Sequence, residues 1–342
     1  MNIGQRQGIL CAGNWLVDYI KIIDTWPAQE TLANTISESR AGGGSPFNVL
    51  IALARLGADF PLQGAGLIGD DEPGEWILQT CRGFDIDVSF MRQTKEAKTS
   101  YTDVMTVQKT GRRTFFHYRG TNALLDEDLI DLERSHARHF HLGYLLLLDR
   151  LDQPGTRSGT KAADLLLRAS ELGFITSADT VSEKSDRFSR LVLPALPFLD
   201  IAFFNEYEAA CVAGVQIRDG DRIDAQMLIE AADSLLKAGV RRWVIIHFPE
   251  GILAAASDGA KLFQPSLNMP ASQIIGTVGA GDAAAAGILF GYHAEMPIER
   301  CLLYGVCTAA ASLRAANGTD GVATLDECLN LKKEFGEREP IL

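Results

Sequence analysis

Short apolar segments alternate with helix-like segments along most of this chain of 342 residues. We predict buried strands at 9–12, 60–66, 139–142, 174–178, 201–204 and 243–247, and helices at 46–56, 75–82, 159–172, 224–238 and 282–293. Strands that alternate with helices form a mainly parallel sheet with helices on both faces, and ligands bind beyond the carboxyl ends of its strands. The sequence therefore predicts an α/β fold, and we expect its two glycine-rich turns to lie at those strand ends.

Two segments, 15–40 and 98–119, interrupt this alternation. Within the second segment, residues 102–107 and 113–118 have the character of strands, and the short connection between them predicts a β-hairpin. On the sequence alone, an ordinary solvent-facing hairpin accounts for this segment.

The glycine-rich turn near the end of the chain has the composition of a phosphoryl-transfer site. Residues 276–287 read Gly-Thr-Val-Gly-Ala-Gly-Asp-Ala-Ala-Ala-Ala-Gly. Gly279 and Gly281 permit a turn with outward-facing backbone N–H groups, and the alanines that follow favour a helix whose positive end would hold a phosphate. Asp282 is suited to accept a proton from a hydroxyl beside that phosphate, as a general base. The alternative is that Asp282 merely caps the helix.

An earlier glycine cluster has the composition of a sugar site. Residues 41–48 read Ala-Gly-Gly-Gly-Ser-Pro-Phe-Asn, and the apolar spacing of 49–57 predicts a helix after them. The three glycines allow backbone to approach a small polar ligand, and the Asn48 amide offers the donor and the acceptor that a pair of sugar hydroxyls needs. A plain strand-to-helix turn capped by Asn48 is the alternative.

Polar residues also follow the predicted strand at 201–204. Asn205 and Glu208 lie three apart on a predicted first helical turn, so they share one side, where they could hold a water-rich magnesium shell against a triphosphate. Helix starts of this composition are also common without a metal.

Cations in the hairpin segment are further candidates for anion binding. Arg119 directly precedes Gly120-Thr121-Asn122, and Arg113 and Lys98 lie nearby in the sequence. A guanidinium matches the shape of a phosphate or a carboxylate. The alternative is that these side chains keep an exposed β surface soluble.

In order and spacing, these segments resemble the motifs of the ribokinase-like, phosphofructokinase-B type carbohydrate kinases. The matching segments are 13–18, 43–48, 64–74, 120–122, 205–208 and 279–282, so the likeness extends over nearly the whole chain. It implies a three-layer α/β/α fold in one domain, 1–342, with a mainly parallel central sheet. It also implies a small β-sheet lid, built from approximately 15–40 and 98–119, that pairs with its twin in a homodimer.

The resemblance implies a role for each matching residue. The expected sugar contacts are Asp18, Gly43, Gly44, Asn48, Arg119 and Asn122. The expected nucleotide contacts are Asn205, Glu208, Gly251 and Asn317, with Glu208 holding Mg²⁺ through water. Gly279, Ala280 and Gly281 would form the anion hole, and Asp282 would be the base. The implied reaction transfers the γ-phosphoryl group of ATP to a hydroxyl, expected to be primary, of a sugar, sugar acid or related polyol.

The chain departs from the family pattern in two places. Many members carry Asp-Thr-Thr where this chain has Gly276-Thr277-Val278, so a carboxylate and a hydroxyl are lost and the monovalent-cation site is in doubt. Near the adenine pocket, His247 and Pro249 replace a hydroxyl donor and a permissive glycine. We therefore expect remodelled nucleotide contacts there.

Composition limits the partners that this chain can have. The difference between 32 basic and 44 acidic residues gives a net charge of −12, which disfavours binding to nucleic acid or to an anionic membrane. The six cysteines show no metal or disulfide spacing, and no apolar run is long enough to cross a bilayer. We expect buried reduced thiols and a cytoplasmic enzyme.

Three other functions stay open on the sequence alone. They are a nucleoside kinase of the same family, a non-catalytic sensor of sugar or nucleotide, and a dinucleotide-dependent oxidoreductase. Neither glycine cluster reads Gly-x-Gly-x-x-Gly, which argues against the oxidoreductase.

Overall fold

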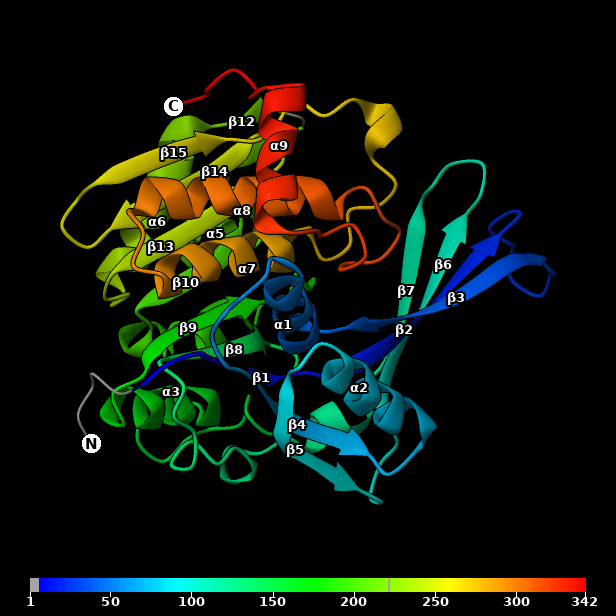
Figure 1. Cartoon of the computed structure of the whole chain (residues 1–342), viewed down its shortest axis with the longest axis horizontal. Helices are drawn as coiled ribbons and strands as arrows, with labels where there is room; N and C mark the ends of the chain where they lie inside the picture. Colours follow the sequence, from blue (N-terminus) through cyan, green and yellow to red (C-terminus); the bar gives the residue numbers. More distant parts are fainter. Residues whose placement is uncertain (1–5, 221) are drawn as a thin grey trace.

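The computed structural model describes residues 6–220 and 222–342 (Figure 1). Its centre is a nine-stranded sheet in which all strand pairs from β13 to β5 are parallel, whereas β14 and β15 add antiparallel pairs at one edge. The order across the sheet is β15 (Lys261–Pro265), β14 (Gly251–Ala256), β13 (Trp243–Phe248), β10 (Ile201–Asn205), β9 (Ile175–Thr180), β8 (His139–Leu145), β1 (Ile9–Gly13), β4 (Leu62–Gly69) and β5 (Asp87–Thr94). The predicted α/β fold with a mainly parallel sheet is confirmed.

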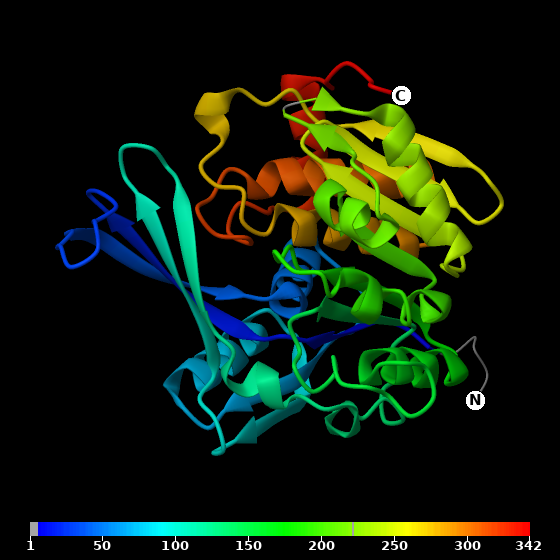
Figure 2. The ribbon, with the colours of Figure 1, turned by 180° about the vertical axis from the view of Figure 1, so that it is seen from behind.

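Helices cover both faces of this large sheet (Figures 1 and 2). One face carries α1 (Ser45–Arg55), α2 (Glu72–Gly83), α7 (Ala280–His293), α8 (Ile298–Ser312) and α9 (Leu325–Phe335). The other face carries α3 (Lys161–Glu171), α4 (Phe188–Val192), α5 (Glu206–Ala213) and α6 (Ala225–Lys237). Each face has its own hydrophobic core, so the sheet separates two packed layers.

Short elements connect these layers. They are the 3₁₀ helices η2 (Gly120–Leu124), η3 (Glu127–Leu129), η4 (Leu196–Phe198) and η5 (Ala271–Gln273), and the ribbon of β11 (Arg218–Asp219) and β12 (Arg222–Ile223).

The six predicted strands and five predicted helices are all present, and the largest difference at a helix start is at α2. This helix begins at Glu72 rather than at 75, because the Asp71 side chain caps it by accepting a hydrogen bond from the backbone N–H of Gly74. Strands β5, β14 and β15 of the large sheet and helices α4, α8 and α9 were not predicted. Strand β14 reads Gly-Ile-Leu-Ala-Ala-Ala, and alanine favours helices, so its burial in the sheet overrides local propensity.

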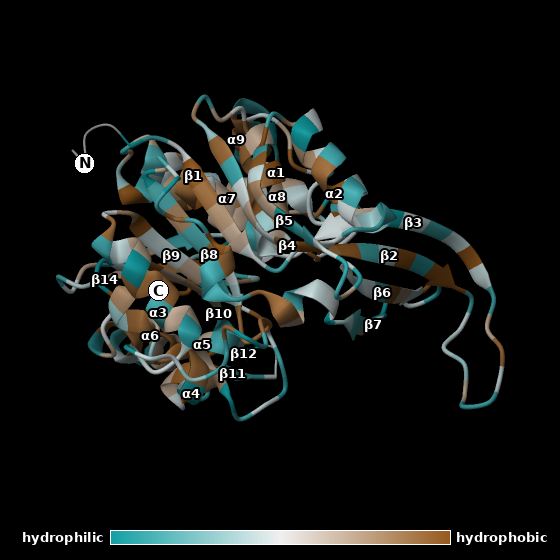
Figure 3. Cartoon of the chain, turned by 90° about the horizontal axis from the view of Figure 1, so that it is seen from below, coloured by the Kyte–Doolittle hydropathy of each residue, from teal (hydrophilic) through white to brown (hydrophobic). Residues whose placement is uncertain are grey.

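A second, four-stranded sheet projects from the body (Figures 1 and 3). This small sheet has the order β3 (Thr35–Gly43), β2 (Leu16–Ile23), β6 (Ser100–Val107) and β7 (Arg113–Tyr118). Strands β6 and β7 are antiparallel, with Tyr101 opposite Tyr118 and Thr106 opposite Arg113. The predicted hairpin is therefore confirmed, and it belongs to a separate sheet.

Both glycine-rich turns lie at the carboxyl ends of strands of the large sheet, as expected, although neither directly follows one of those strands: Gly281 lies against His247 of β13, and Ser45 donates to Asp179 of β9. Gly42 and Gly43 are the last residues of β3, so the first cluster joins the small sheet to α1. The second turn follows a segment, 266–279, that contains η5 and no strand. The two turns meet because α1 and α7 pack side by side on the same face of the large sheet (Figure 1).

None of the helices within 6–220 and 222–342 has the length and apolar character needed to cross a bilayer. The six cysteines are free, and all are buried except Cys211, which is half-buried. The expectation of buried reduced thiols is thus confirmed for five of the six, while the cytoplasmic location stays a prediction.

Candidate active site

The second glycine turn forms the beginning of α7. Gly279 is the N-cap residue in the left-handed conformation, with φ 75°, and no side chain caps this helix. A Cβ atom at Gly279 would lie 2.4 Å from the Cα of Gly318, and one at Gly281 would lie 2.8 Å from Cε1 of His247. Only glycine fits at these two positions, and the uncapped positive end of α7 is suited to an anion.

Asp282 lies in the first turn of α7 but does not cap it. The residue is 4% exposed. Oδ2 of its carboxylate accepts a hydrogen bond of 2.7 Å from Nδ2 of Asn48, and the Tyr144 hydroxyl lies 2.8 Å from Oδ1 and 2.7 Å from Oδ2. Burial, together with the nearby Asp179 carboxylate, raises the pKa of Asp282 to about 7. A carboxyl group poised near neutral pH is suited to general base catalysis.

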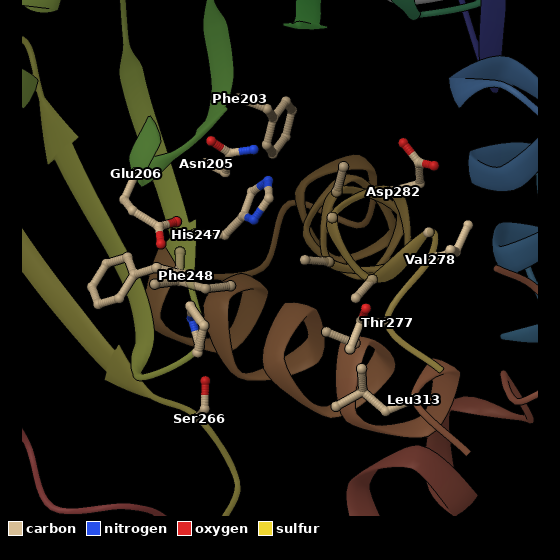
Figure 4. Close-up of a pocket in the computed structure, with 18 of the residues that line it drawn as sticks. Phe203, Asn205, Glu206, His247, Phe248, Ser266, Thr277, Val278, Asp282 and Leu313 are labelled. Carbon is tan, nitrogen blue, oxygen red and sulfur yellow. The ribbon is translucent and has the colours of Figure 1, made fainter. Parts of the chain in front are cut away.

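Asp282 separates two sides of the site. Figure 4 shows its carboxylate pointing away from the side of α7 on which His247 and Phe248 lie. We call the side toward which the carboxylate points, where Asn48 of α1 lies, the acceptor side. We call the opposite side, where His247 of β13 lies, the nucleotide side.

The acceptor side brings together five of the predicted sugar contacts, namely Asp18, Gly43, Gly44, Asn48 and Asn122. A Cβ atom at Gly43 would lie 2.6 Å from Oδ2 of Asp18, and one at Gly44 would lie 2.0 Å from the carbonyl oxygen of Asn14, so backbone and side chains are packed closely here. Burial raises the pKa of Asp18 to about 7, with Asp282 contributing and a hydrogen bond from Thr102 opposing. The alternative that Asn48 caps α1 is excluded, because the N-cap is Gly44 and no side chain caps the helix.

Several polar atoms on this side are buried and have no hydrogen-bond partner. They are both amide atoms of Asn14, Oδ1 of Asn48, Oγ1 of Thr121 and Nδ2 of Asn122. A buried polar atom without a partner costs free energy, which a hydroxyl-rich ligand would recover. Neither Asn14 nor Thr121 was predicted to be a site residue, although both lie within segments that match the family.

The structure does not bring Arg119 to Asp282. Its Nη1 lies 2.9 Å from Oδ1 of Asp149, in a partly exposed ion pair. Asn122 is buried, and its Oδ1 accepts a hydrogen bond from the backbone N–H of Trp15. A contact between Arg119 and the sugar stays a prediction.

The nucleotide side is a cavity of about 810 Å³ with a largely apolar wall (Figure 4). Phe248, Ile252 and Leu267 contribute to the wall, and Asn205 and Glu208 are among its polar residues. His247 also lines the cavity, and burial lowers its pKa to about 4, so its imidazole is neutral. Gly251 and Asn317 are not among the lining residues: Gly251 packs against Phe263 of β15, and Asn317 donates to Asp320.

Asn205 and Glu208 cap α5 reciprocally. The Asn205 side chain accepts from the backbone N–H of Glu208, and Oε2 of Glu208 accepts from the backbone N–H of Asn205 at 3.0 Å. Oε1 of Glu208 accepts from Ser182 at 2.8 Å and from Nδ2 of Asn205 at 3.0 Å. Burial raises the pKa of Glu208 to about 7, against these hydrogen bonds.

This arrangement fits magnesium only as a water-rich ion. Within the described ranges, no three histidine, cysteine, aspartate or glutamate side chains are grouped to hold a metal. Mg²⁺ keeps several waters and binds substrate phosphates, so one or two nearby carboxylates suffice. Glu208 would therefore hold the ion through water.

The loop before the anion-binding turn offers few side-chain ligands to a monovalent cation. Gly276 has no side chain and Val278 has no side-chain oxygen. A Cβ atom at Gly276 would lie 2.7 Å from Nη2 of Arg113 and 2.7 Å from the carbonyl oxygen of Ala315, so a guanidinium from the small sheet reaches this loop. Nη1 of Arg113 is buried without a partner.

Comparison with known proteins decides the family. The model of the pfkB family of carbohydrate kinases matches residues 8–325. The chain belongs to this family. It is therefore a carbohydrate kinase, as the resemblance implied.

Individual relatives agree with this assignment. The chain is 27% identical over 327 residues to an ATP-dependent ribose-1-phosphate kinase of Halopiger xanaduensis, covering 92% of this chain and 96% of that protein. It is 26% identical over 289 residues to probable fructokinase-6 of Arabidopsis thaliana, covering 82% and 69%. The structure of Arabidopsis thaliana ribokinase complexed with ribose and ATP superposes with a TM-score of 0.79 at 19% identity, covering 96% of this chain and 99% of that one.

Proposed function

We propose that this carbohydrate kinase transfers the γ-phosphoryl group of ATP to a primary hydroxyl of a sugar, sugar acid or related polyol, with Asp282 as the general base. The observation that carries the proposal is the place of Asp282 between the two sides. Its buried carboxylate contacts Asn48 on the acceptor side, and it belongs to the helix whose uncapped N-terminus adjoins the nucleotide cavity.

Different residues carry out different parts of the proposed reaction. The acceptor hydroxyl loses its proton to Asp282 as its oxygen bonds to the γ-phosphorus and the bond from that phosphorus to ADP breaks. The N-terminus of α7 at Gly279, Ala280 and Gly281 stabilises the charge of the transferring group. A magnesium ion near Glu208 and Asn205 would neutralise charge on the triphosphate.

The small sheet would act as a lid over the cleft. Phe115 of β7 lines the nucleotide cavity, and Arg113 two residues earlier reaches Gly276. A sheet that touches this cavity can exclude water, which would otherwise compete with the acceptor for the phosphoryl group.

The acceptor side favours a neutral, hydroxyl-rich group near the base. Its unpartnered atoms are amides and a hydroxyl, and no cation among residues 6–220 and 222–342 contacts Asp282 or Asn48. Names of relatives include fructokinases, a ribose-1-phosphate kinase and a 5-dehydro-2-deoxygluconokinase, so an acidic or phosphorylated group elsewhere on the acceptor is compatible with the family.

A panel of acceptors tests the proposal. ADP release is measured with hexoses, pentoses, sugar phosphates, sugar acids and nucleosides, and NMR of the product identifies the phosphorylated hydroxyl. We expect turnover with a member of the sugar classes at a primary hydroxyl. Turnover with nucleosides alone would favour the nucleoside kinase instead, which the similarity to an archaeal nucleoside kinase structure, with a TM-score of 0.75, keeps as the second candidate.

We also propose that two copies pair through their small sheets. Strands β3 and β7 are its open edges, and Trp26, Leu32, Ile36, Phe116 and Tyr118 on its strands and loops are large, hydrophobic and exposed. Open edges and exposed apolar side chains favour association. Light scattering at micromolar concentration should give the mass of a dimer, and Ile36→Lys should shift it toward the monomer; a monomeric wild-type chain contradicts this pairing.

A further inference from the structure

Tyr144 contacts Asp282, and the proposed reaction leaves it without a role. It lies in β8, lines the cavity, and directs its hydroxyl at both oxygens of the Asp282 carboxylate, at 2.8 and 2.7 Å. Burial and the charges of Asp282 and Asp179 raise the pKa of Tyr144 well above its usual value. The group is therefore a neutral phenol that donates its proton to the carboxylate.

The phenol lies where an acceptor hydroxyl has to lie. A general base takes a proton from a hydroxyl whose oxygen is about 2.6 to 3.2 Å from one of its own oxygens. The Tyr144 hydroxyl meets this condition for Oδ1 and Oδ2 together, and Asn48 takes a further position on Oδ2. Asp282 is otherwise buried, so Oδ1 and Oδ2 offer few remaining directions to a second hydroxyl.

We propose that Tyr144 gates the base: its phenol stays hydrogen-bonded to the Asp282 carboxylate until the acceptor hydroxyl displaces it. The proposal rests on the proposed function, in which Asp282 is that base. Tyr144 is a positioning residue here, because it acts through Asp282 and leaves the phosphoryl group untouched.

The gate would suppress hydrolysis of ATP. Hydrolysis requires Asp282 to take a proton from water while the water oxygen bonds to the γ-phosphorus and the bond from that phosphorus to ADP breaks, which yields ADP and phosphate. A phenol in place of that water excludes it, and the raised pKa of the Tyr144 hydroxyl keeps the proton on the phenol. The free enzyme then keeps ATP intact, and a sugar that fills the acceptor side releases the base.

Tyr144→Phe removes only the hydroxyl and tests the gate. We expect phosphate release without any acceptor, measured with saturating ATP at about pH 8, to rise about tenfold, a part of the 10²- to 10⁴-fold that a positioned base supplies. The acceptor KM should stay the same or fall, because no phenol has to be displaced. Unchanged hydrolysis together with a raised acceptor KM would mean that Tyr144 is a sugar contact and would overturn the gate.

Two further variants define what the hydrolysis depends on. In Tyr144→Phe combined with Asp282→Asn, the extra hydrolysis should return to the wild-type level, and its persistence would overturn the proposal. The matched control is Tyr304→Phe, a buried tyrosine of α8 whose hydroxyl accepts from Arg300 away from the cavity. This control should hydrolyse ATP at the wild-type rate.

A titration that needs no turnover separates this proposal from the proposed function. The hydrogen bond from Tyr144 lowers the pKa of Asp282, so its loss should raise that pKa by about one unit. Carboxyl ¹³C NMR, with the Asp282 signal assigned by its absence in Asp282→Asn, measures the shift. An unchanged pKa in Tyr144→Phe overturns the gate, whereas full turnover in Asp282→Asn alone overturns the base, and with it the proposed function.

Discussion

The two sides of Asp282 differ in how their polar groups are satisfied. On the acceptor side, amide atoms of Asn14, Asn48 and Asn122 are buried and have no partner. On the nucleotide side, Asn205 and Glu208 satisfy each other, Oδ1 of Asp179 is buried without a partner, and the rest of the wall is largely apolar. A side with unpartnered polar atoms selects its ligand by hydrogen bonds that match those atoms. A largely apolar side binds its ligand by shape and by burial of apolar surface.

This difference predicts where substitutions act. A change at Asp282, which serves both sides, should abolish chemistry and leave binding intact. A change on the acceptor side alone should weaken binding of the acceptor and leave binding of ATP unaffected.

The largest effect is expected for Asp282→Asn. Asparagine keeps the shape and can still accept hydrogen bonds from Asn48 and Tyr144, but it cannot take a proton, so kcat should fall by about 10²-fold or more. Steady-state kinetics with the acceptor found in the panel measure the fall. ATP and acceptor binding, followed by calorimetry, should change little, and near-normal turnover would remove Asp282 from its role.

The next effect separates the two sides. Asp18→Ala and Asn48→Ala should each raise the acceptor KM about tenfold, because each leaves a hydroxyl of the bound sugar without its partner. The ATP KM should change less than about twofold in Asp18→Ala, the cleaner of the two, since Asn48 also contacts Asp282. Equal changes for both substrates would show that the acceptor side has been misplaced.

The sequence predicts Asp282 well because its chemistry is local. The glycines, the base and the helix of 276–287 are consecutive, and each residue type has one physical role there. The partners of Asp282 were harder to find. Asn48 was predicted to contact the sugar, but its hydrogen bond to Asp282, 234 positions away, depends on the packing of α1 against α7.

Nothing in the sequence around Tyr144 or Asp179 predicted that these residues belong to the site. Tyr144 interrupts an apolar run that reads as an ordinary buried strand, and Asp179 lies near the end of another strand without any motif around it. Both reach the site because the parallel strands β8 and β9 end at the same edge of the large sheet. The fold as a whole was predictable from periodicity, whereas the alanine-rich β14 was not, because its residues favour a helix.

A third prediction concerns the stability of the substrate-free chain. Burial raises the pKa values of Asp18, Glu208 and Asp282 to about 7 in the folded chain, whereas they return to ordinary values on unfolding. The folded chain then binds more protons than the unfolded chain between about pH 4 and pH 7, so the free energy of unfolding falls as the pH rises through this range.

Asp282→Asn removes one of these groups and should stabilise the chain at high pH. We expect its gain over wild type to be larger at about pH 8 than at about pH 5 by roughly 1 to 3 kcal/mol, below the full equivalent of a three-unit pKa shift. Thermal unfolding at both pH values measures the difference. The same gain at both pH values would show that Asp282 is not held neutral in the fold.

The smallest effect is expected for potassium. A monovalent ion beside the anion-binding turn needs oxygen ligands, and Gly276 and Val278 supply none from their side chains, while the Arg113 guanidinium already lies against Gly276. Burial lowers the pKa of Arg113 from its usual value, but a guanidinium starts so high that it stays charged near neutral pH and repels a second cation. We expect turnover to change less than about twofold when potassium replaces a bulky organic cation at constant ionic strength, well under 1 kcal/mol in the barrier.

Carbonyl oxygens alone can hold potassium in channel filters, so the same titration on Arg113→Met identifies the reason for any insensitivity. If the missing oxygen ligands prevent potassium binding, turnover of this variant is also insensitive to potassium. If the guanidinium prevents it, potassium activates the variant and leaves the wild-type enzyme unchanged. Strong, saturable activation of the wild-type enzyme by potassium, with sodium ineffective, would show that backbone carbonyls hold the ion despite both features.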